Sequence, residues 1–203
     1  MRVLPSGTAA LLVELDDLDG VLALYTALAA DPPVGVIDVV PAGRTVLVVT
    51  APDVELATVA RALRSVTPRP GRGLDGELVE LPVSYDGEDL DDVATFLGCD
   101  REGVVRRHRE EEWTVAFCGF APGFGYLTGT HHAWEIPRRS SPRTRVPAGS
   151  VALAGEFTGV YPRESPGGWQ LLGRTDVPVF DLDRDPAALL RPGTRVRFVD
   201  VTP

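Results

Sequence analysis

The chain contains no lysine and no asparagine, and all 20 of its basic residues are arginine. The absence of lysine excludes Schiff-base chemistry and the phosphate-binding lysine of a P-loop. Any contact with a phosphate group must therefore come from arginine side chains or from backbone N–H groups. The net charge of −9 also argues against nucleic acid as the main partner.

Cysteines and long apolar runs are scarce as well. The two cysteines, Cys99 and Cys118, lack the spacing of metal ligands and stand beside apolar residues, so we expect them to be buried free thiols. No stretch approaches the roughly 20 apolar residues that a membrane span needs, and the first residues lack the apolar region of a secretory signal. We therefore expect a cytoplasmic protein.

Only three histidines are available for acid–base chemistry: His108, His131 and His132. The adjacent pair lies in a polar segment and is predicted to occupy a surface loop, and a metal site that combines it with Glu135 is not favoured. His108 ends a predicted helix just before three consecutive glutamates. There it could stabilise the helix end as a cation, or it could act as an acid or base in a site.

The first part of the chain predicts a small α/β layer. Strands are expected at 8–15, 36–40, 45–50 and 78–83, and helices at 21–30, capped by Asp19, and from Asp53 onward. The order β-α-β-β-α-β is that of a ferredoxin-like fold. A Pro- and Gly-rich linker at 67–76 ends this region, so the predicted domains are 1–76 and 77–203.

Two short helices, at 89–97 and 101–109, are expected next. The remaining chain consists of short β-prone runs separated by Gly/Pro turns, among them 113–117, 150–154, 169–172, 179–181 and 195–199. Strands this short at this spacing are typical of a barrel or a sandwich. The predicted fold class is therefore α+β, with the small α/β layer followed by an all-β part.

Glycine, proline, aromatic residues and arginine gather in five patches of the second half: 117–127, 141–150, 159–162, 165–169 and 172–175. Glycine and proline fix unusual backbone shapes and are costly for a chain that only needs to fold. We interpret the patches as a loop-built binding surface on a β scaffold. Arg143, Arg145 and Arg174 lie in its stiff loops, where they could hold carboxylate or phosphate. Arg138 and Arg139 are instead predicted to form a solvated basic face.

The aromatic residues of these patches have two open interpretations. They could wall an apolar pocket or a protein interface, or some could belong to the core, because aromatic burial dominates core energetics. The predicted pocket wall comprises Phe120, Pro122, Phe124, Tyr126, Tyr161 and Trp169.

These patches, in this order, resemble the KipI / 5-oxoprolinase B-subunit (PxpB) family, also described as allophanate hydrolase subunit 1. The most specific segments are 119–127, 142–154 and 165–175, and the resemblance covers essentially the whole chain. It implies an N-terminal α/β domain followed by a cyclophilin-like β-barrel domain. The chain departs from the family pattern at Gly125, where proline is usual, and at 130–135.

The resemblance also implies work in a complex, and we expect the chain to be inactive alone. The chain would pair with the KipA-type C subunit of 5-oxoprolinase and with the A subunit of that enzyme. The complex would use ATP to open 5-oxo-L-proline to L-glutamate. No metal motif is visible in this chain. The implied site combines a phosphate- or carboxylate-binding set, Arg143, Arg145, Arg174, Ser150 and Ser165, with His108 as the acid or base.

Two other functions remain open. Members of the resembled family include an inhibitor of a sensor histidine kinase and the carboxyltransferase region of urea carboxylase. The chain could therefore bind a kinase through the aromatic face of its barrel. Alternatively, it could form part of a urea or amide carboxylase–hydrolase system, with biotin supplied by a separate chain.

Overall fold

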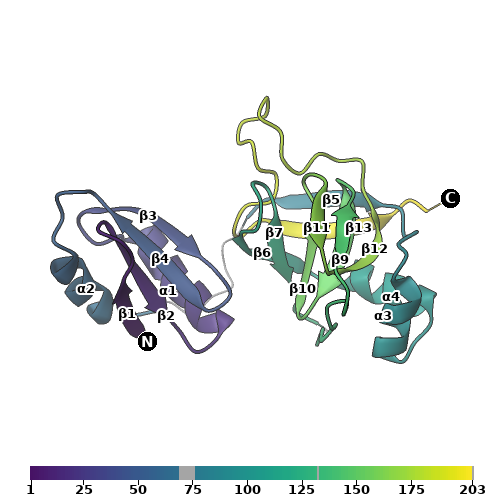
Figure 1. Cartoon of the computed structure of the whole chain (residues 1–203), viewed down its shortest axis with the longest axis horizontal. Helices are drawn as coiled ribbons and strands as arrows, with labels where there is room; N and C mark the ends of the chain where they lie inside the picture. The colour runs from purple at the N-terminus through teal and green to yellow at the C-terminus, as the bar shows by residue number, and fades with distance from the viewer. Residues whose placement is uncertain (69–75, 132, 203) are drawn as a thin grey trace. The chain divides into compact units, whose positions relative to one another are not determined.

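The computed structural model describes residues 1–68, 76–131 and 133–202. The chain forms two compact units, Met1–Leu74 and Asp75–Pro203, which are described separately (Figure 1). In the described residues, no helix is long and apolar enough to cross a membrane.

The first unit is a four-stranded antiparallel sheet in the order β1-β2-β4-β3, with two helices on one face. Its elements are β1 (Arg2–Pro5), β2 (Ala10–Glu14), α1 (Leu18–Ala30), β3 (Val36–Pro41), β4 (Thr45–Thr50) and α2 (Leu56–Ser65). Buried and half-buried side chains alternate along the two central strands, so Leu11, Val13, Val46 and Val48 share one apolar face. Buried apolar residues of both helices pack on that face.

Three details of this unit differ from the prediction. Helix α2 begins at Leu56 with Glu55 as its N-cap residue, whereas Asp53 was predicted to cap it. The strand at 78–83 is not part of this sheet, and β1 forms its edge instead. β1 pairs with β2 through a tight turn in which Gly7 has a φ of 65°, a conformation that glycine adopts at little cost. Helix α1 is capped by Asp17, whose carboxylate accepts a hydrogen bond of 2.8 Å from the N–H of Gly20, and not by Asp19. β1 escaped prediction because four residues ending in proline give almost no periodic pattern.

The second unit is built around a seven-stranded sheet in the order β12-β9-β10-β7-β6-β13-β5. Its strands are β5 (Leu78–Val83), β6 (Trp113–Cys118), β7 (Gly125–Thr128), β9 (Ser150–Ala154), β10 (Phe157–Val160), β12 (Gln170–Arg174) and β13 (Arg195–Asp200). β13 pairs in parallel with β5 and antiparallel with β6. A separate two-stranded sheet consists of β8 (Arg143–Val146) and β11 (Ser165–Gly167).

The two edges of the seven-stranded sheet meet, which makes it a nearly closed barrel. Ser84, one residue beyond β5, exchanges two backbone hydrogen bonds of 2.9 Å with Arg174 at the end of β12. The N–H of Gly87 extends this contact by donating to the carbonyl of Leu172 at 3.0 Å. The predicted α+β class with a barrel in its second part is confirmed.

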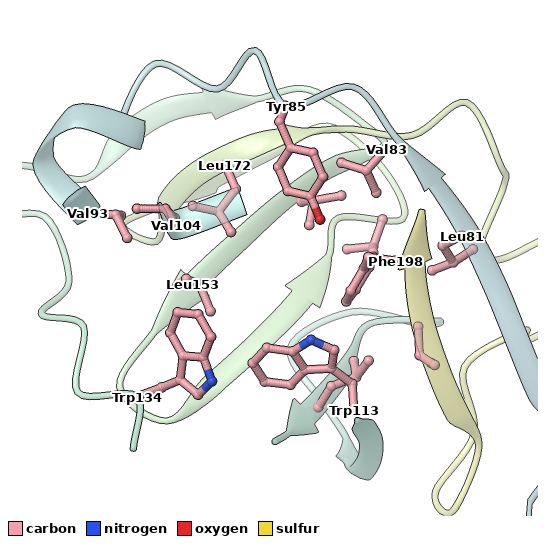
Figure 2. Close-up of a cluster of buried hydrophobic side chains, with 14 of the residues drawn as sticks. Leu81, Val83, Tyr85, Val93, Val104, Trp113, Trp134, Leu153, Leu172 and Phe198 are labelled. Carbon is pink, nitrogen blue, oxygen red and sulfur yellow. The ribbon is translucent and has the colours of Figure 1, made fainter. Parts of the chain in front are cut away.

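Helices α3 (Leu90–Leu97) and α4 (Arg101–Glu110) pack against the barrel, and their bounds are close to the predicted ones. α3 ends at Gly98, whose φ of 63° gives the left-handed conformation common at helix ends. α4 begins after Asp100, whose carboxylate accepts a hydrogen bond of 2.7 Å from the N–H of Gly103. Figure 2 shows the barrel core, in which these side chains point into one cluster: Tyr85, Trp113, Trp134 and Phe198.

Candidate functional site

Five aromatic residues of the glycine- and proline-rich patches meet in one place, which we call the aromatic cluster: Phe120, Phe124, Tyr126, Tyr161 and Trp169. Phe124 is buried at its centre. The ring centroid of Phe124 lies 5.1 Å from that of Tyr126 and 5.3 Å from those of the other three. These residues come from the turn between β6 and β7, from β7, from the position directly after β10 and from the turn before β12. The folding of the barrel therefore brings three separate sequence patches together.

Close packing under this cluster explains two glycines of the patches. A Cβ atom at Gly159 would meet the ring of Phe124, and one at Gly167 would meet the hydroxyl and ring of Tyr161. The backbone must therefore pass close to the rings at both positions, and only glycine leaves the necessary space. Glycine here serves the packing of the aromatic cluster.

Phe120 is the exposed member of the cluster and has an unusual backbone. Its φ is 65°, and its side chain remains 58% exposed although it packs against Phe124 and Tyr161. A non-glycine residue in this region carries a strain of about 1–2 kcal/mol. The surrounding turn fixes it, because Gly119 donates to the carbonyl of Phe124 at 3.1 Å and Phe124 donates to that of Ala121 at 3.0 Å. Such strain at an exposed aromatic residue is typical of functional surfaces.

The predicted pocket wall is thus partly a core and partly a surface. Phe124, Tyr161 and Trp169 are buried, Tyr126 is half-buried, and Pro122 is exposed with Phe120. Two cavities formed by described residues lie elsewhere, with volumes of about 270 and 370 Å³. The first is lined by residues that include Tyr85, Val105 and Arg109, and the second by residues that include Leu97, Arg107 and Trp134. The six predicted residues do not line these two cavities.

Arg143 is engaged by a buried carboxylate. Its guanidinium donates to both carboxylate oxygens of Asp89, at 2.8 and 2.9 Å, and to Glu88 at 2.9 Å. Asp89 is only 2% exposed, and it also accepts from Arg139 at 2.5 Å and from the N–H of Leu171 at 2.7 Å. Burial acts to raise the pKa of the Asp89 carboxyl, but the hydrogen bonds from Arg143 and Leu171 and the nearby positive charges hold it below its usual value.

The other two predicted arginines also face carboxylates, each in a different place. Arg145 forms two hydrogen bonds with Glu164, at 3.0 and 2.8 Å, and Arg174 lies 3.4 Å from Asp86. Both pairs are exposed and therefore weak. Each of the three arginines predicted to hold phosphate or carboxylate is thus already paired with an acid of this chain, and their role in binding an anion stays a prediction.

The two predicted serines lie in different sheets. Ser150 is buried at the start of β9, where it pairs in register with Arg174. Ser165 opens β11 and pairs with Val146, and its hydroxyl donates to the carbonyl of Arg163 at 3.1 Å. These positions suit backbone pairing and do not place the two hydroxyls on one ligand.

His108 lies in the barrel core and is fully buried. Its Nδ1 is 2.8 Å from the hydroxyl of Tyr85, and its Nε2 is 2.9 Å from the hydroxyl of Thr158. Because the Thr158 hydroxyl donates to the carbonyl of Ala152 at 3.1 Å, it accepts from Nε2, which assigns the ring proton to Nε2. The His108 ring also stacks on that of Phe198, with centroids 4.4 Å apart.

Burial lowers the pKa of His108 to about 3, so the imidazole is neutral at physiological pH. Both roles offered for it above are therefore corrected: it is neither a cation at a helix end nor an acid or base within reach of a ligand. It acts as a hydrogen-bonding core residue.

Two further sequence expectations have clear outcomes. Cys99 and Cys118 are free thiols, as predicted, although both are only half-buried. The Cys118 thiol donates to the carbonyl of Leu190 at 3.3 Å, and burial raises its pKa to about 11. His131 is exposed, as predicted for a surface loop, and its Nδ1 lies 3.2 Å from the buried carboxylate of Glu111. His132 lies outside the described residues.

Comparison with known proteins gives a consistent family match. A family model described as carboxyltransferase domain, subdomain C and D, matches residues 1–190. The B subunit of 5-oxoprolinase from Escherichia coli O157:H7 is 48% identical over 128 residues, which are 62% of this chain and 59% of that protein. The B subunit of 5-oxoprolinase from Bacillus subtilis strain 168 is 46% identical over 128 residues, 62% of this chain and 53% of that protein.

A solved structure supports the fold over nearly the whole chain. The crystal structure of TTHA0988 is 39% identical and has a TM-score of 0.77, and the match covers 96% of this chain but 40% of TTHA0988. The aligned part thus spans little more than half the length of the two curated relatives, and a smaller share of TTHA0988.

Proposed function

This chain belongs to the carboxyltransferase domain, subdomain C and D, family, and on that basis we propose that it is the B-type subunit of an ATP-dependent 5-oxoprolinase. The predicted resemblance to the KipI / 5-oxoprolinase B-subunit family is confirmed. The observation that carries the proposal is the 46–48% identity to two proteins of that name. The proposed substrate is 5-oxo-L-proline, and the proposed product is L-glutamate.

The proposed reaction breaks the C–N bond of a lactam. One water supplies an OH group to the carbonyl carbon and a proton to the ring nitrogen, and a second water is consumed as ATP is converted to ADP and phosphate. A lactam is a stable amide, so its opening in water is slow, and coupling to ATP provides the driving force. Binding of the flat ring suits the aromatic cluster, whose members Phe120 and Tyr126 reach the surface.

The charge distribution supports dependence on partner proteins. In the described part of the chain, Arg143, Arg145 and Arg174 are each paired with a carboxylate, and His108 is enclosed in the core. These residues do not fit a preformed phosphate site. We therefore propose that ATP is held mainly by the KipA-type C subunit together with the A subunit, and that this chain contributes part of the lactam site. The cytoplasmic location stays a prediction.

Reconstitution tests this proposal. The chain would be purified with A- and C-type proteins of 5-oxoprolinase from the same organism, and ADP and glutamate would be measured with and without 5-oxo-L-proline. We expect both products only when all three proteins and the lactam are present. A stable complex without turnover of the lactam would refute the substrate. Failure to form any complex would refute the role in a multi-protein enzyme and would favour the binding of a sensor kinase.

A further inference from the structure

The segment that carries Arg138 is fixed on both sides. The carbonyl of Pro137 accepts a hydrogen bond of 3.0 Å from the side-chain amide of Gln170, which is buried. The N–H of Arg139 donates to the carbonyl of Gly168 at 2.8 Å, and its guanidinium pairs with the buried Asp89. The backbone of Arg138 is therefore held against the turn between β11 and β12, which contains Trp169.

The side chain of Arg138 itself is available to a ligand. It is exposed, and within 1–68, 76–131 and 133–202 it has neither an ion pair nor a hydrogen bond. Its neighbour Arg139 and the three arginines predicted to bind an anion all face carboxylates. The sequence predicted a solvated basic face for both Arg138 and Arg139; Arg138 is exposed, as predicted, whereas Arg139 pairs with the buried Asp89. A rigid backbone that presents one free guanidinium is the arrangement expected of a binding residue.

Arg138 lies beside the aromatic cluster. Its segment runs along Gly168–Gln170, and the ring of Trp169 in that turn contacts Tyr126, with centroids 5.5 Å apart. Burial raises the pKa of the Tyr126 and Tyr161 hydroxyls, and the positive charge of Arg138 acts to lower both. Arg138 thus lies near half-buried Tyr126, and both Tyr126 and exposed Phe120 pack against Phe124.

This combination is complementary to a small, flat, anionic molecule. A guanidinium offers forked donors to a carboxylate, and the ring faces offer apolar contact. We propose that Arg138 binds the carboxylate of the lactam substrate, with the five-membered ring of that substrate on Tyr126 and Phe120. The assignment rests on the function proposed above. Asp89 is then a positioning residue, because it holds Arg139 and Arg143 and so fixes the Arg138 segment.

Kinetics of the reconstituted complex test the assignment. The variants are Arg138→Ala and Arg138→Lys, with Arg195→Ala as the control, since Arg195 is an exposed arginine on β13. Each would be assayed with 5-oxo-L-proline and with its uncharged primary amide. Loss of a charged hydrogen bond predicts that Arg138→Ala raises KM for the acid roughly 10-fold or more, with a smaller change in kcat.

The preference for the acid over the amide is the deciding measurement. Arg138→Ala should lose most of this preference, Arg138→Lys should keep part of it, and Arg195→Ala should match the wild type. A wild-type KM and a wild-type preference in Arg138→Ala would overturn the assignment.

If the wild-type complex does not turn over the lactam, the function proposed above fails instead. Calorimetric binding of the acid and the amide to the complex then decides the role of Arg138. Weaker binding of the acid to Arg138→Ala would retain the carboxylate site, and equal affinity in both proteins would remove it.

Discussion

Replacing Asp89 with asparagine tests whether its ion-pair network stabilises the second unit. The variant keeps the size of the side chain but removes the charge that both Arg139 and Arg143 contact. Asp89 is 2% exposed, and the side chains of Arg139 and Arg143 are 30% and 16% exposed. Breaking a fully buried pair costs about 3–5 kcal/mol, and the partial exposure of the arginines reduces our expectation to about 2–3 kcal/mol.

The three tryptophans allow this effect to be measured in the second unit alone. Trp113, Trp134 and Trp169 all lie within Asp75–Pro203, so tryptophan fluorescence during urea unfolding does not report directly on the first unit. With a urea dependence of about 1–3 kcal/mol per molar, the midpoint should fall by roughly 0.7–3 M.

Asp91→Asn provides a matched control for Asp89→Asn. Asp91 also forms two hydrogen bonds with one arginine, Arg101, but both side chains are exposed to solvent. Solvent screens such a pair, so we expect no measurable change in the midpoint. Equal midpoints for Asp89→Asn and Asp91→Asn would refute the idea that burial makes the Asp89 network important.

Three further outcomes follow from the described contacts. Between pH 6.5 and about 3 the unfolded chain protonates His108 and the folded chain does not. The free energy of unfolding should therefore decrease as the pH is lowered, by about 2 kcal/mol at pH 5. An unchanged pH profile in His108→Gln would contradict this. Gly167→Ala should cost about 1–3 kcal/mol in urea unfolding, because its Cβ would meet Tyr161, and wild-type stability would show that the loop can move away. Phe120→Gly should change the free energy of unfolding by less than about 1 kcal/mol, because relief of the positive φ offsets the lost ring contacts. The same variant should raise KM for the lactam, and an unchanged KM would remove Phe120 from the site.

Local patterns predicted most of the elements but not all of their partners. Helices α3 and α4 were predicted to within a residue because their periodicity and end residues are local signals. The strand Leu78–Val83 was found in the sequence but assigned to the wrong sheet. Its partner β13 lies more than a hundred residues away, and nothing in the strand itself identifies that partner.

The site was predicted in composition rather than in detail. The aromatic residues of three patches do converge. Glycine at positions such as Gly159 and Gly167 leaves the space that the packing of their rings needs. The arginines were misjudged because their availability depends on acids that are distant in sequence. Arg143 is separated from Asp89 by more than fifty residues, and only the folded chain shows that this pair is formed while Arg138 has no acidic partner among the described residues.

The position of β13 between β5 and β6 has a consequence for synthesis on the ribosome. Residues 195–200 insert between two strands that are made more than seventy residues earlier, so the barrel cannot close until that late segment has emerged. The first unit completes its sheet with residues 1–50 and can fold well before then. During that interval β5 and β6 each lack the strand that later pairs with them. The incomplete second unit is therefore the part of the nascent chain most in need of chaperone protection.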